Sequence, residues 1–305
     1  MDGSRIGSVG FVGLGNMGGP MAANLVKAGY HVSGFDLSEA ALELARRAGV
    51  GIVPSAAETA KSADFVVTML PAGRHVLSTY GDETGLLSAA NIDTVFIDCS
   101  TIDVEDARNA ALAAVSAGHR AIDAPVSGGV VGAEAGTLTF MVGGTDADVA
   151  AVRPLLSAMG RKMVHCGASG AGQAAKLCNN MILAISMIGV SEAFVLAERL
   201  GLSHQALFDV SSTATGQCWA LTSNCPVPGP VPTSPANRDY QAGFSVSLMA
   251  KDLGLAANAL TESAVDAPLG AAAASLYRQL AESDRAREDF STVINHIREH
   301  PSREG

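Results

Sequence analysis

The sequence predicts an α/β protein in which an N-terminal doubly wound sheet is followed by an all-α C-terminal domain, the two being joined by a long helix. A glycine-rich turn, Gly13-x-Gly15-x-x-Gly18, follows a short apolar run near the start of the chain. Strand and helix patterns then alternate up to about residue 166, and mainly helical patterns follow. The 305 residues suit two domains at ~150 residues each, which we place at 1–168 and 169–305.

The first domain consists of short apolar runs separated by amphipathic segments. Ile6 to Val12 has the pattern of a buried strand, and Ser38 suits the N-cap of a later helix. Such alternation is typical of βαβ units and a mainly parallel, Rossmann-type sheet. Further strands are predicted at 31–35, 50–53, 65–70, 95–98, 120–123, 137–142 and 162–166, and helices at 21–27, 39–47, 56–61, after Pro71, 104–117 and 146–159.

A single long helix is predicted from residue 173 to residue 200. This stretch has no proline, its apolar residues recur at helical spacing, and Gly201 follows its end. At ~1.5 Å per residue it is roughly 40 Å long, which suits a spine between two domains. Lys176 and Asn180 lie four residues apart near its start, and therefore on one face. They are candidates for chemistry, although a lysine that snorkels out of a domain junction would look the same.

The C-terminal half is helical with one break. Five prolines lie between Cys225 and Gly243, and helical patterns resume near Val246, Leu269 and Phe290. Because helical segments flank this break on both sides, we interpret it as a long loop inside the second domain.

Composition excludes several classes of function. The net charge of −10 argues against nucleic acid and against an anionic membrane surface, and the most apolar run, 181–190, is about half the ~20 residues of a membrane span. The five cysteines form no CxxC pair and the seven histidines lack metal-ligand spacing, so we expect no metal and a reducing compartment. A strand pattern close to Met1 leaves no room for a presequence, which predicts a cytoplasmic protein, although a processed organellar protein would look the same.

The glycine turn predicts a dinucleotide site. Glycines allow a tight turn and let backbone N–H groups approach a pyrophosphate at a helix N-terminus. Asp36 ends the second strand pattern, where a carboxylate can accept hydrogen bonds from the adenosine ribose. Residues 37–39 include no arginine for a 2′-phosphate, which favours NAD over NADP.

Four other segments are ambiguous on their own. Residues 68–71 and 98–101 each follow a strand pattern, where ligands of open α/β sheets bind, but ordinary turns lie there too. Ser127-Gly128-Gly129 offers a hydroxyl and open backbone N–H groups to a carboxylate, although a flexible turn is the simpler interpretation. Lys251-Asp252, on an apolar helix, is by itself more typical of a solvated pair.

Taken together, these motifs resemble the β-hydroxyacid dehydrogenase family from end to end. The resemblance is carried by four segments, and residues 219–244 look like the hydroxyisobutyrate branch of the family in particular. The four segments are Gly13-Leu-Gly-Asn-Met-Gly-Gly-Pro-Met-Ala-Ala-Asn24, Asp123-Ala-Pro-Val-Ser-Gly-Gly129, Gly170-Ala-Gly-Gln-Ala-Ala-Lys-Leu-Cys-Asn-Asn180 and Lys251-Asp-Leu-Gly-Leu-Ala256.

The resemblance implies a role for each matching residue. Lys176 would be the catalytic acid/base. Substrate would be bound by Ser127, Gly128, Gly129, Asn180 and Trp219. NAD would be bound by Gly13, Leu14, Gly15, Asn16, Met17, Gly18, Asp36, Leu70, Pro71, Thr101, Phe244 and Lys251.

The resemblance also implies an activity, namely NAD-dependent oxidation of 3-hydroxyisobutyrate to methylmalonate semialdehyde, a step of valine catabolism. An unperturbed lysine has a pKa of ~10.4, so we expect burial and the cationic nicotinamide to disfavour the charged form of Lys176. Rival interpretations are a related hydroxyacid or semialdehyde substrate of the tartronate, succinic or glyoxylic type, or an NAD-binding protein without turnover. The apolar helical half predicts a homodimer or homotetramer.

Overall fold

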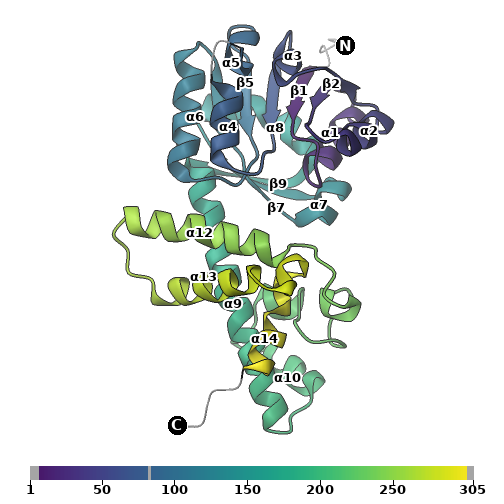
Figure 1. Ribbon diagram of the computed structural model, residues 1–305, viewed down its shortest axis with the longest axis vertical. Coiled ribbons are helices and arrows are strands. Elements are labelled where there is room, and N and C mark those ends of the chain that lie inside the picture. The colour runs from purple at the N-terminus through teal and green to yellow at the C-terminus, as the bar shows by residue number, and fades with distance from the viewer. Residues whose placement is uncertain (1–6, 82–83, 301–305) are drawn as a thin grey trace. The chain divides into compact units, whose positions relative to one another are not determined.

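The computed structural model describes residues 7–81 and 84–300, so residue 6 of the first predicted strand and the segment used to judge a presequence lie outside it (Figure 1). The chain forms two compact units, Met1–Lys176 and Leu177–Gly305, called here the sheet unit and the helical unit. Their boundary falls inside helix α9 (Ala171–Arg199), eight residues beyond the one placed from the sequence. The first turn of α9 belongs to the sheet unit because Gln173 hydrogen-bonds to Asp123 and Ser100 of that unit.

The sheet unit contains the predicted doubly wound sheet. The strand order is β3-β2-β1-β4-β5-β6-β8-β7, and β9 pairs with β8. Strands β1 to β6 are mutually parallel, whereas β8 runs antiparallel to β6 and β7. The strands are β1 (Ser8–Val12), β2 (His31–Phe35), β3 (Gly51–Ile52), β4 (Phe65–Thr68), β5 (Val95–Asp98), β6 (Arg120–Asp123), β7 (Val126–Ser127), β8 (Leu138–Gly143) and β9 (Gly160–Gly167).

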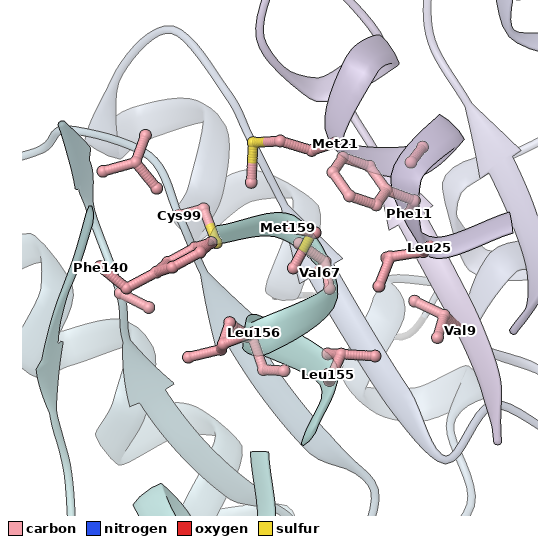
Figure 2. Packing of buried hydrophobic residues seen from close by; sticks show 14 of the residues in the cluster. Val9, Phe11, Met21, Leu25, Val67, Cys99, Phe140, Leu155, Leu156 and Met159 are labelled. Atoms are coloured by element: carbon pink, nitrogen blue, oxygen red, sulfur yellow. The ribbon is translucent and has the colours of Figure 1, made fainter. Parts of the chain in front are cut away.

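Helices cover both faces of this sheet, which explains why its inner strands β1, β4 and β5 are mostly apolar and buried. On β5, Ile97 belongs to one core and Phe96 to the other. Figure 2 shows the first core, in which Phe11 and Val67 pack with Leu155 of α8. The helices are α1 (Gly18–Lys27), α2 (Glu39–Arg47), α3 (Ala56–Ala60), α4 (Gly73–Tyr80), α5 (Leu86–Ala89), α6 (Val104–Ser116), α7 (Gly129–Ala135) and α8 (Asp146–Met159).

The helical unit packs around the C-terminal part of α9. Ala184 and Met187 of α9 are fully buried with Met249, Leu253 and Tyr277. The other elements of this unit are α10 (His204–Ser211), α11 (Trp219–Thr222), η1 (Pro235–Arg238), α12 (Val246–Glu262), α13 (Pro268–Ala281), η2 (Asp284–Arg287), η3 (Phe290–Thr292) and α14 (Val293–Glu299), where η marks a 3₁₀ helix.

Helix α9 is long and apolar enough, by length and composition alone, to cross a bilayer. Its most apolar 18 residues have a mean hydropathy of 1.8, and 33% of them are buried. Core helices of globular proteins pass the same test, and Leu177, Ala184 and Met187 are buried. One face of α9 therefore belongs to the core of its unit.

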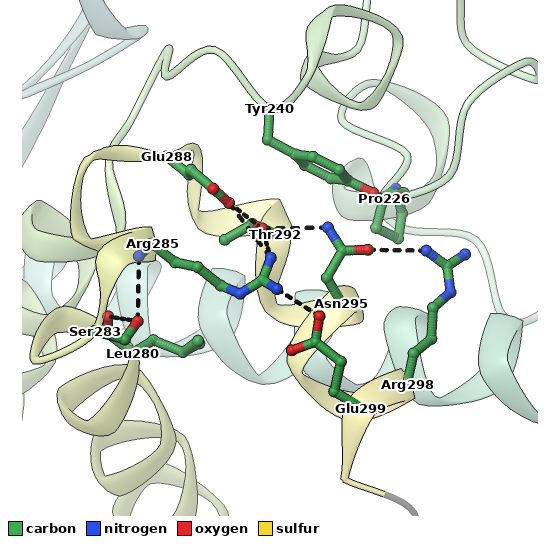
Figure 3. A network of polar contacts seen from close by, with 10 residues as sticks. All are labelled: Pro226, Tyr240, Leu280, Ser283, Arg285, Glu288, Thr292, Asn295, Arg298 and Glu299. Atoms are coloured by element: carbon green, nitrogen blue, oxygen red, sulfur yellow. Dashed lines mark hydrogen bonds and ion pairs between the residues drawn. The ribbon is translucent and has the colours of Figure 1, made fainter.

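The proline-rich loop is held by polar contacts. The Tyr240 hydroxyl donates to the Pro226 carbonyl at 2.8 Å, which closes one end of the loop on the other (Figure 3). In the same view Arg285 joins η2 to α14 by an ion pair with Glu299 at 2.5 Å. The predicted loop is therefore an ordered part of the helical unit.

Candidate active site

The carboxyl ends of four neighbouring parallel strands lie level with one another. Val12 of β1 is paired in register with Thr68 of β4, Thr68 with Asp98 of β5, and Asp98 with Asp123 of β6. The glycine turn and the segments starting at 69, 99 and 124 therefore leave the same edge of the sheet. The chain order changes between β1 and β4, which is where open α/β sheets bind their ligands.

The geometry of the glycine turn fits a bound pyrophosphate. Gly13 has φ +94°, and a Cβ there would lie 2.2 Å from the Met69 carbonyl oxygen; a Cβ on Gly18 would lie 1.8 Å from that of Gly13. A Cβ on Gly15 would meet nothing within 4 Å, so this side of the turn is open. Helix α1 begins at Gly18 with no side-chain cap and no acidic residue in its first turn. The Gly19 N–H already donates to the Gly15 carbonyl at 2.9 Å, so the start of α1 would attract an anion mainly through the positive end of its dipole.

Asp36 joins the end of β2 to the glycine turn. Its Oδ2 accepts the Leu14 N–H at 2.6 Å and its Oδ1 accepts the Ser38 N–H at 2.7 Å. An ionised carboxylate has about four acceptor positions, so these two bonds leave room for a ribose hydroxyl. The neighbouring Leu37 is 94% exposed.

A buried polar group lies beneath the segments that follow β4 and β5. Asp98 Oδ1 accepts the hydroxyls of Thr68 at 2.7 Å and Ser100 at 2.6 Å, while its buried Oδ2 has no hydrogen-bond partner among the described residues. Burial raises the pKa of Asp98 to about 6, against hydrogen bonds from Ser100 and Thr68 that lower it. The Ser100 hydroxyl also accepts the Leu70 N–H at 2.8 Å, which fixes Leu70, a predicted cofactor residue. Pro71, another such residue, is exposed.

Asp123 and Gln173 hold the start of α9, and neither was predicted to have a role. Asp123 Oδ1 accepts the Gly170 N–H at 2.7 Å and its Oδ2 accepts the Gln173 N–H at 2.9 Å. The Gln173 side chain is fully buried; it donates to the Ser100 carbonyl at 2.7 Å and accepts the Ile102 N–H at 3.2 Å. The signal that could have found them is their place, at a strand end and in the turn before Lys176.

Lys176 and Asn180 lie one turn apart on α9 and are 7% and 2% exposed. Asn180 Nδ2 donates to Asp252 Oδ2 at 2.6 Å, and its Oδ1 accepts from Asn179 at 3.0 Å. Asp252 is 3% exposed, so the interpretation of Lys251-Asp252 as a solvated pair is wrong for the aspartate. Its buried neighbours Met249 and Leu253 on α12 were the signal for this.

The segment Ser127-Gly128-Gly129 connects β7 to α7. Ser127 ends β7, and Gly128 and Gly129 have φ +137° and +61° before α7 begins. Backbone of this kind requires glycine and leaves N–H groups without neighbouring Cβ atoms. Ser127 is half-buried and Gly128 is exposed.

Three of the remaining predicted residues lie in the sheet unit: Asn16 is exposed and Met17 half-buried in the glycine turn, and Thr101 is half-buried between Ser100 and Ile102. The others belong to the helical unit. Trp219 begins α11 and is 55% exposed. Phe244 precedes α12. Its N–H donates to Asp289 at 3.1 Å, and the centroid of its ring lies 5.9 Å from that of the Phe290 ring. Lys251 is half-buried in α12. The roles given to all these residues remain predictions.

Within residues 7–81 and 84–300, no group of three or more histidine, cysteine or acidic residues could hold a metal ion. All five cysteines are free thiols.

Two family models match the chain. Residues 8–167 match the NAD-binding domain of 6-phosphogluconate dehydrogenase, and residues 170–297 match the NAD-binding domain of NADP-dependent 3-hydroxyisobutyrate dehydrogenase.

Three similar proteins cover almost the whole chain. A probable 3-hydroxyisobutyrate dehydrogenase of Mycobacterium bovis is 55% identical over 95% of the chain and 98% of the relative. An NAD-dependent L-serine dehydrogenase of Pseudomonas aeruginosa is 47% identical over 93% and 96%. A solved structure of Mycobacterium tuberculosis 3-hydroxyisobutyrate dehydrogenase with L-serine has a TM-score of 0.93 and 54% identity, covering 96% of the chain and 100% of that chain. The chain therefore belongs to the 3-hydroxyisobutyrate dehydrogenase family of NAD-dependent oxidoreductases.

Proposed function

We propose that this protein oxidises 3-hydroxyisobutyrate to methylmalonate semialdehyde with NAD, as a step of valine catabolism, and that Lys176 is its general acid/base. The observation that supports this most is a lysine only 7% exposed in the first turns of α9, a helix whose start is hydrogen-bonded to the carboxyl edge of the sheet. The relative with 55% identity carries the name of this activity.

In this proposal Lys176 accepts the hydroxyl proton of the substrate and returns it in the reverse reaction. Burial disfavours the charged form of an amine, and only the neutral form can accept a proton. Bound NAD would accept the hydride from the carbinol carbon. The Ser127 hydroxyl and the glycine backbone at 128 and 129, which carries no Cβ atoms, suit the substrate carboxylate.

Asn180 would hold the substrate beside Lys176. Its carboxamide orientation is set by Asp252, because a carboxylate can only accept and therefore takes the Nδ2 donor at 2.6 Å. This leaves the Asn180 Oδ1, which already accepts from Asn179, on the other side. Asp252 would thus act on substrate binding through Asn180.

Asp36 would set the preference for NAD. Its carboxylate would repel the 2′-phosphate of NADP and accept hydrogen bonds from the ribose of NAD. Its bonds to Leu14 and Ser38 keep it at the end of β2.

L-Serine is a second candidate substrate. A relative with 47% identity is named an L-serine dehydrogenase, and the similar solved structure contains L-serine. Serine and 3-hydroxyisobutyrate are both 3-hydroxy acids with a primary alcohol, so the same carboxylate site and the same lysine would serve either. They differ at C2, where a charged ammonium replaces a methyl group.

The proposal is tested by measuring the formation of reduced nicotinamide with (S)-3-hydroxyisobutyrate, L-serine, glycerate and 4-hydroxybutyrate, each with NAD and with NADP. We expect the highest kcat/KM for 3-hydroxyisobutyrate with NAD. Higher kcat/KM for serine or glycerate would retain the mechanism and overturn the substrate. Tight NAD binding without turnover of any of the four would favour the non-catalytic alternative.

A further inference from the structure

We propose that Gln173 is a positioning residue, which couples the loop after β5 to the turn of α9 that carries Lys176. The proposal rests on the function proposed above for Lys176. It concerns how the proton acceptor is held relative to the loop that would line the cofactor, and all its contacts lie within the sheet unit.

The Gln173 carboxamide forms two hydrogen bonds with the backbone after β5, as the backbone of a neighbouring strand would. Its Nε2 donates to the Ser100 carbonyl at 2.7 Å and its Oε1 accepts the Ile102 N–H at 3.2 Å. These two backbone groups flank Thr101, so one carboxamide fixes the backbone on both sides of a predicted cofactor residue. Gln173 is fully buried, and water cannot replace either bond without rearrangement.

The backbone of Gln173 is fixed as well. Its N–H donates to Asp123 Oδ2 at 2.9 Å, beside the bond from the Gly170 N–H to Asp123 Oδ1. Close packing adds to this, because a Cβ on Gly172 would lie 2.3 Å from the Met141 carbonyl oxygen. The first turn of α9 therefore cannot rotate or slide without losing buried hydrogen bonds, and Lys176 lies three residues further on the same side.

The coupling extends to a second loop through Ser100. The Ser100 hydroxyl accepts the Leu70 N–H at 2.8 Å, while its carbonyl accepts from Gln173. The loops after β4 and β5 and the start of α9 thus share one set of bonds. Hydride and proton leave neighbouring atoms of the substrate, and a displacement of ~1 Å in such a site can cost on the order of 100-fold in rate.

If Gln173 had a purely structural role, replacing it would lower the stability of the protein without changing how kcat depends on pH. Q173E separates the two roles, because the substitution keeps size and shape. The ionised carboxylate cannot donate to the Ser100 carbonyl, whereas the protonated carboxyl group has both an acceptor oxygen and an O–H donor. Lowering the pH should therefore rebuild the two bonds in this variant.

The experiment compares kcat and KM of the full-length protein, Q173E, Q173M and the control Q279E across pH. Gln279 is exposed on α13. We expect kcat of Q173E to be about tenfold below the wild-type value at high pH and to approach the wild-type value as the pH falls. The KM values for the hydroxyacid and for NAD should change far less. Q173M should lose kcat at every pH, and Q279E should follow wild type.

A second readout does not depend on turnover. Amide hydrogen exchange of Leu70 and Ile102 should be faster in Q173E at high pH than in wild type, and should return to the wild-type rate at low pH. If wild type turns over none of the hydroxyacids, this exchange pattern still supports the coupling, and only the proposed function fails.

The proposal is overturned if the kcat ratio of Q173E to wild type does not vary with pH, or if the loss appears mainly in KM. It is also overturned if exchange at Leu70 and Ile102 is unchanged. Should Q173E fail to fold, Q173M decides the question, because it fills the same volume without polar atoms. Wild-type kcat in a folded Q173M would exclude a positioning role.

Discussion

Lys176 is the residue whose loss should most affect turnover. General acid/base catalysis contributes about 10²–10⁴-fold, so K176A should lower kcat/KM by at least roughly 100-fold. NAD binding, followed by fluorescence, should be nearly unchanged, because the glycine turn and Asp36 remain. K162A is a matched control, since Lys162 is exposed on β9. Turnover close to wild type in K176A would assign the proton transfer to another group.

Asp98 should make stability depend on pH. Burial raises its pKa from 3.8 to about 6, so the folded state binds the proton more tightly than the unfolded chain. Its stabilising contribution is therefore complete below about pH 4 and is lost as the pH rises to about 6. Two units correspond to about 3 kcal/mol, an order-of-magnitude figure.

D98N tests this, because the amide keeps an acceptor for Thr68 and Ser100 and cannot ionise. Urea unfolding should show D98N gaining about 2–3 kcal/mol relative to wild type between pH 4 and pH 7. Asp123, whose charge also raises the pKa of Asp98, is present in both proteins, and burial keeps the pKa of Tyr80 far above this pH range. If the free energies of unfolding of D98N and wild type changed in parallel with pH, the pKa of Asp98 would not be raised in the folded state.

Residues of a local motif were predictable, and residues defined by a distant partner were not. Gly13, Gly18 and Asp36 follow from spacing along one βαβ unit, and the structure gives each the place that the spacing requires. Asp252 binds Asn180, 72 residues away, and Gln173 binds Ser100, 73 residues away. No local pattern reports such a pair, so both contacts required the fold.

At the scale of elements, two glycines of α9 should respond in opposite ways to alanine. A Cβ on Gly172 would lie 2.3 Å from the Met141 carbonyl and 2.7 Å from Asp123 Oδ2, whereas a Cβ on Gly189 would meet nothing within 4 Å. G172A should therefore cost about 1–3 kcal/mol by overpacking. G189A should stabilise by about 0.5–1 kcal/mol, because glycine is a poor residue inside a helix.

Chemical unfolding of the two variants measures this difference. Equal effects would contradict the close contact between α9 and β8 at Gly172. G172A should also lower kcat, because the substitution displaces the turn before Lys176, whereas G189A lies more than three turns away.

Long periodic elements were predictable and several short ones were not. The helices predicted at 39–47 and 146–159 have these bounds in the structure, and α9 differs by one or two residues at each end. The four-residue α5, the two-residue β7 and the seven-residue α7 were missed. They are too short to show a periodic pattern of apolar residues, and tertiary packing rather than local propensity stabilises them.

At the scale of the whole molecule, we propose a homodimer or homotetramer formed through the helical unit. Among the described residues, nine large apolar side chains are exposed in this unit, against seven in the longer sheet unit: Ile182, Leu196, Leu200, Leu202, Val210, Trp219, Leu248, Val265 and Leu269. Only 33% of the most apolar window of α9 is buried within one chain. A second copy of the same surface would remove these side chains from water.

Sedimentation equilibrium should therefore give at least twice the mass of one chain. L196E should weaken the assembly, because association would bury a charge that stays solvated in the single chain. L44E is the matched control, since Leu44 is 67% exposed on α2 of the sheet unit, against 60% for Leu196. A monomeric wild type would overturn the proposal, and equal effects of L196E and L44E would move the interface away from α9.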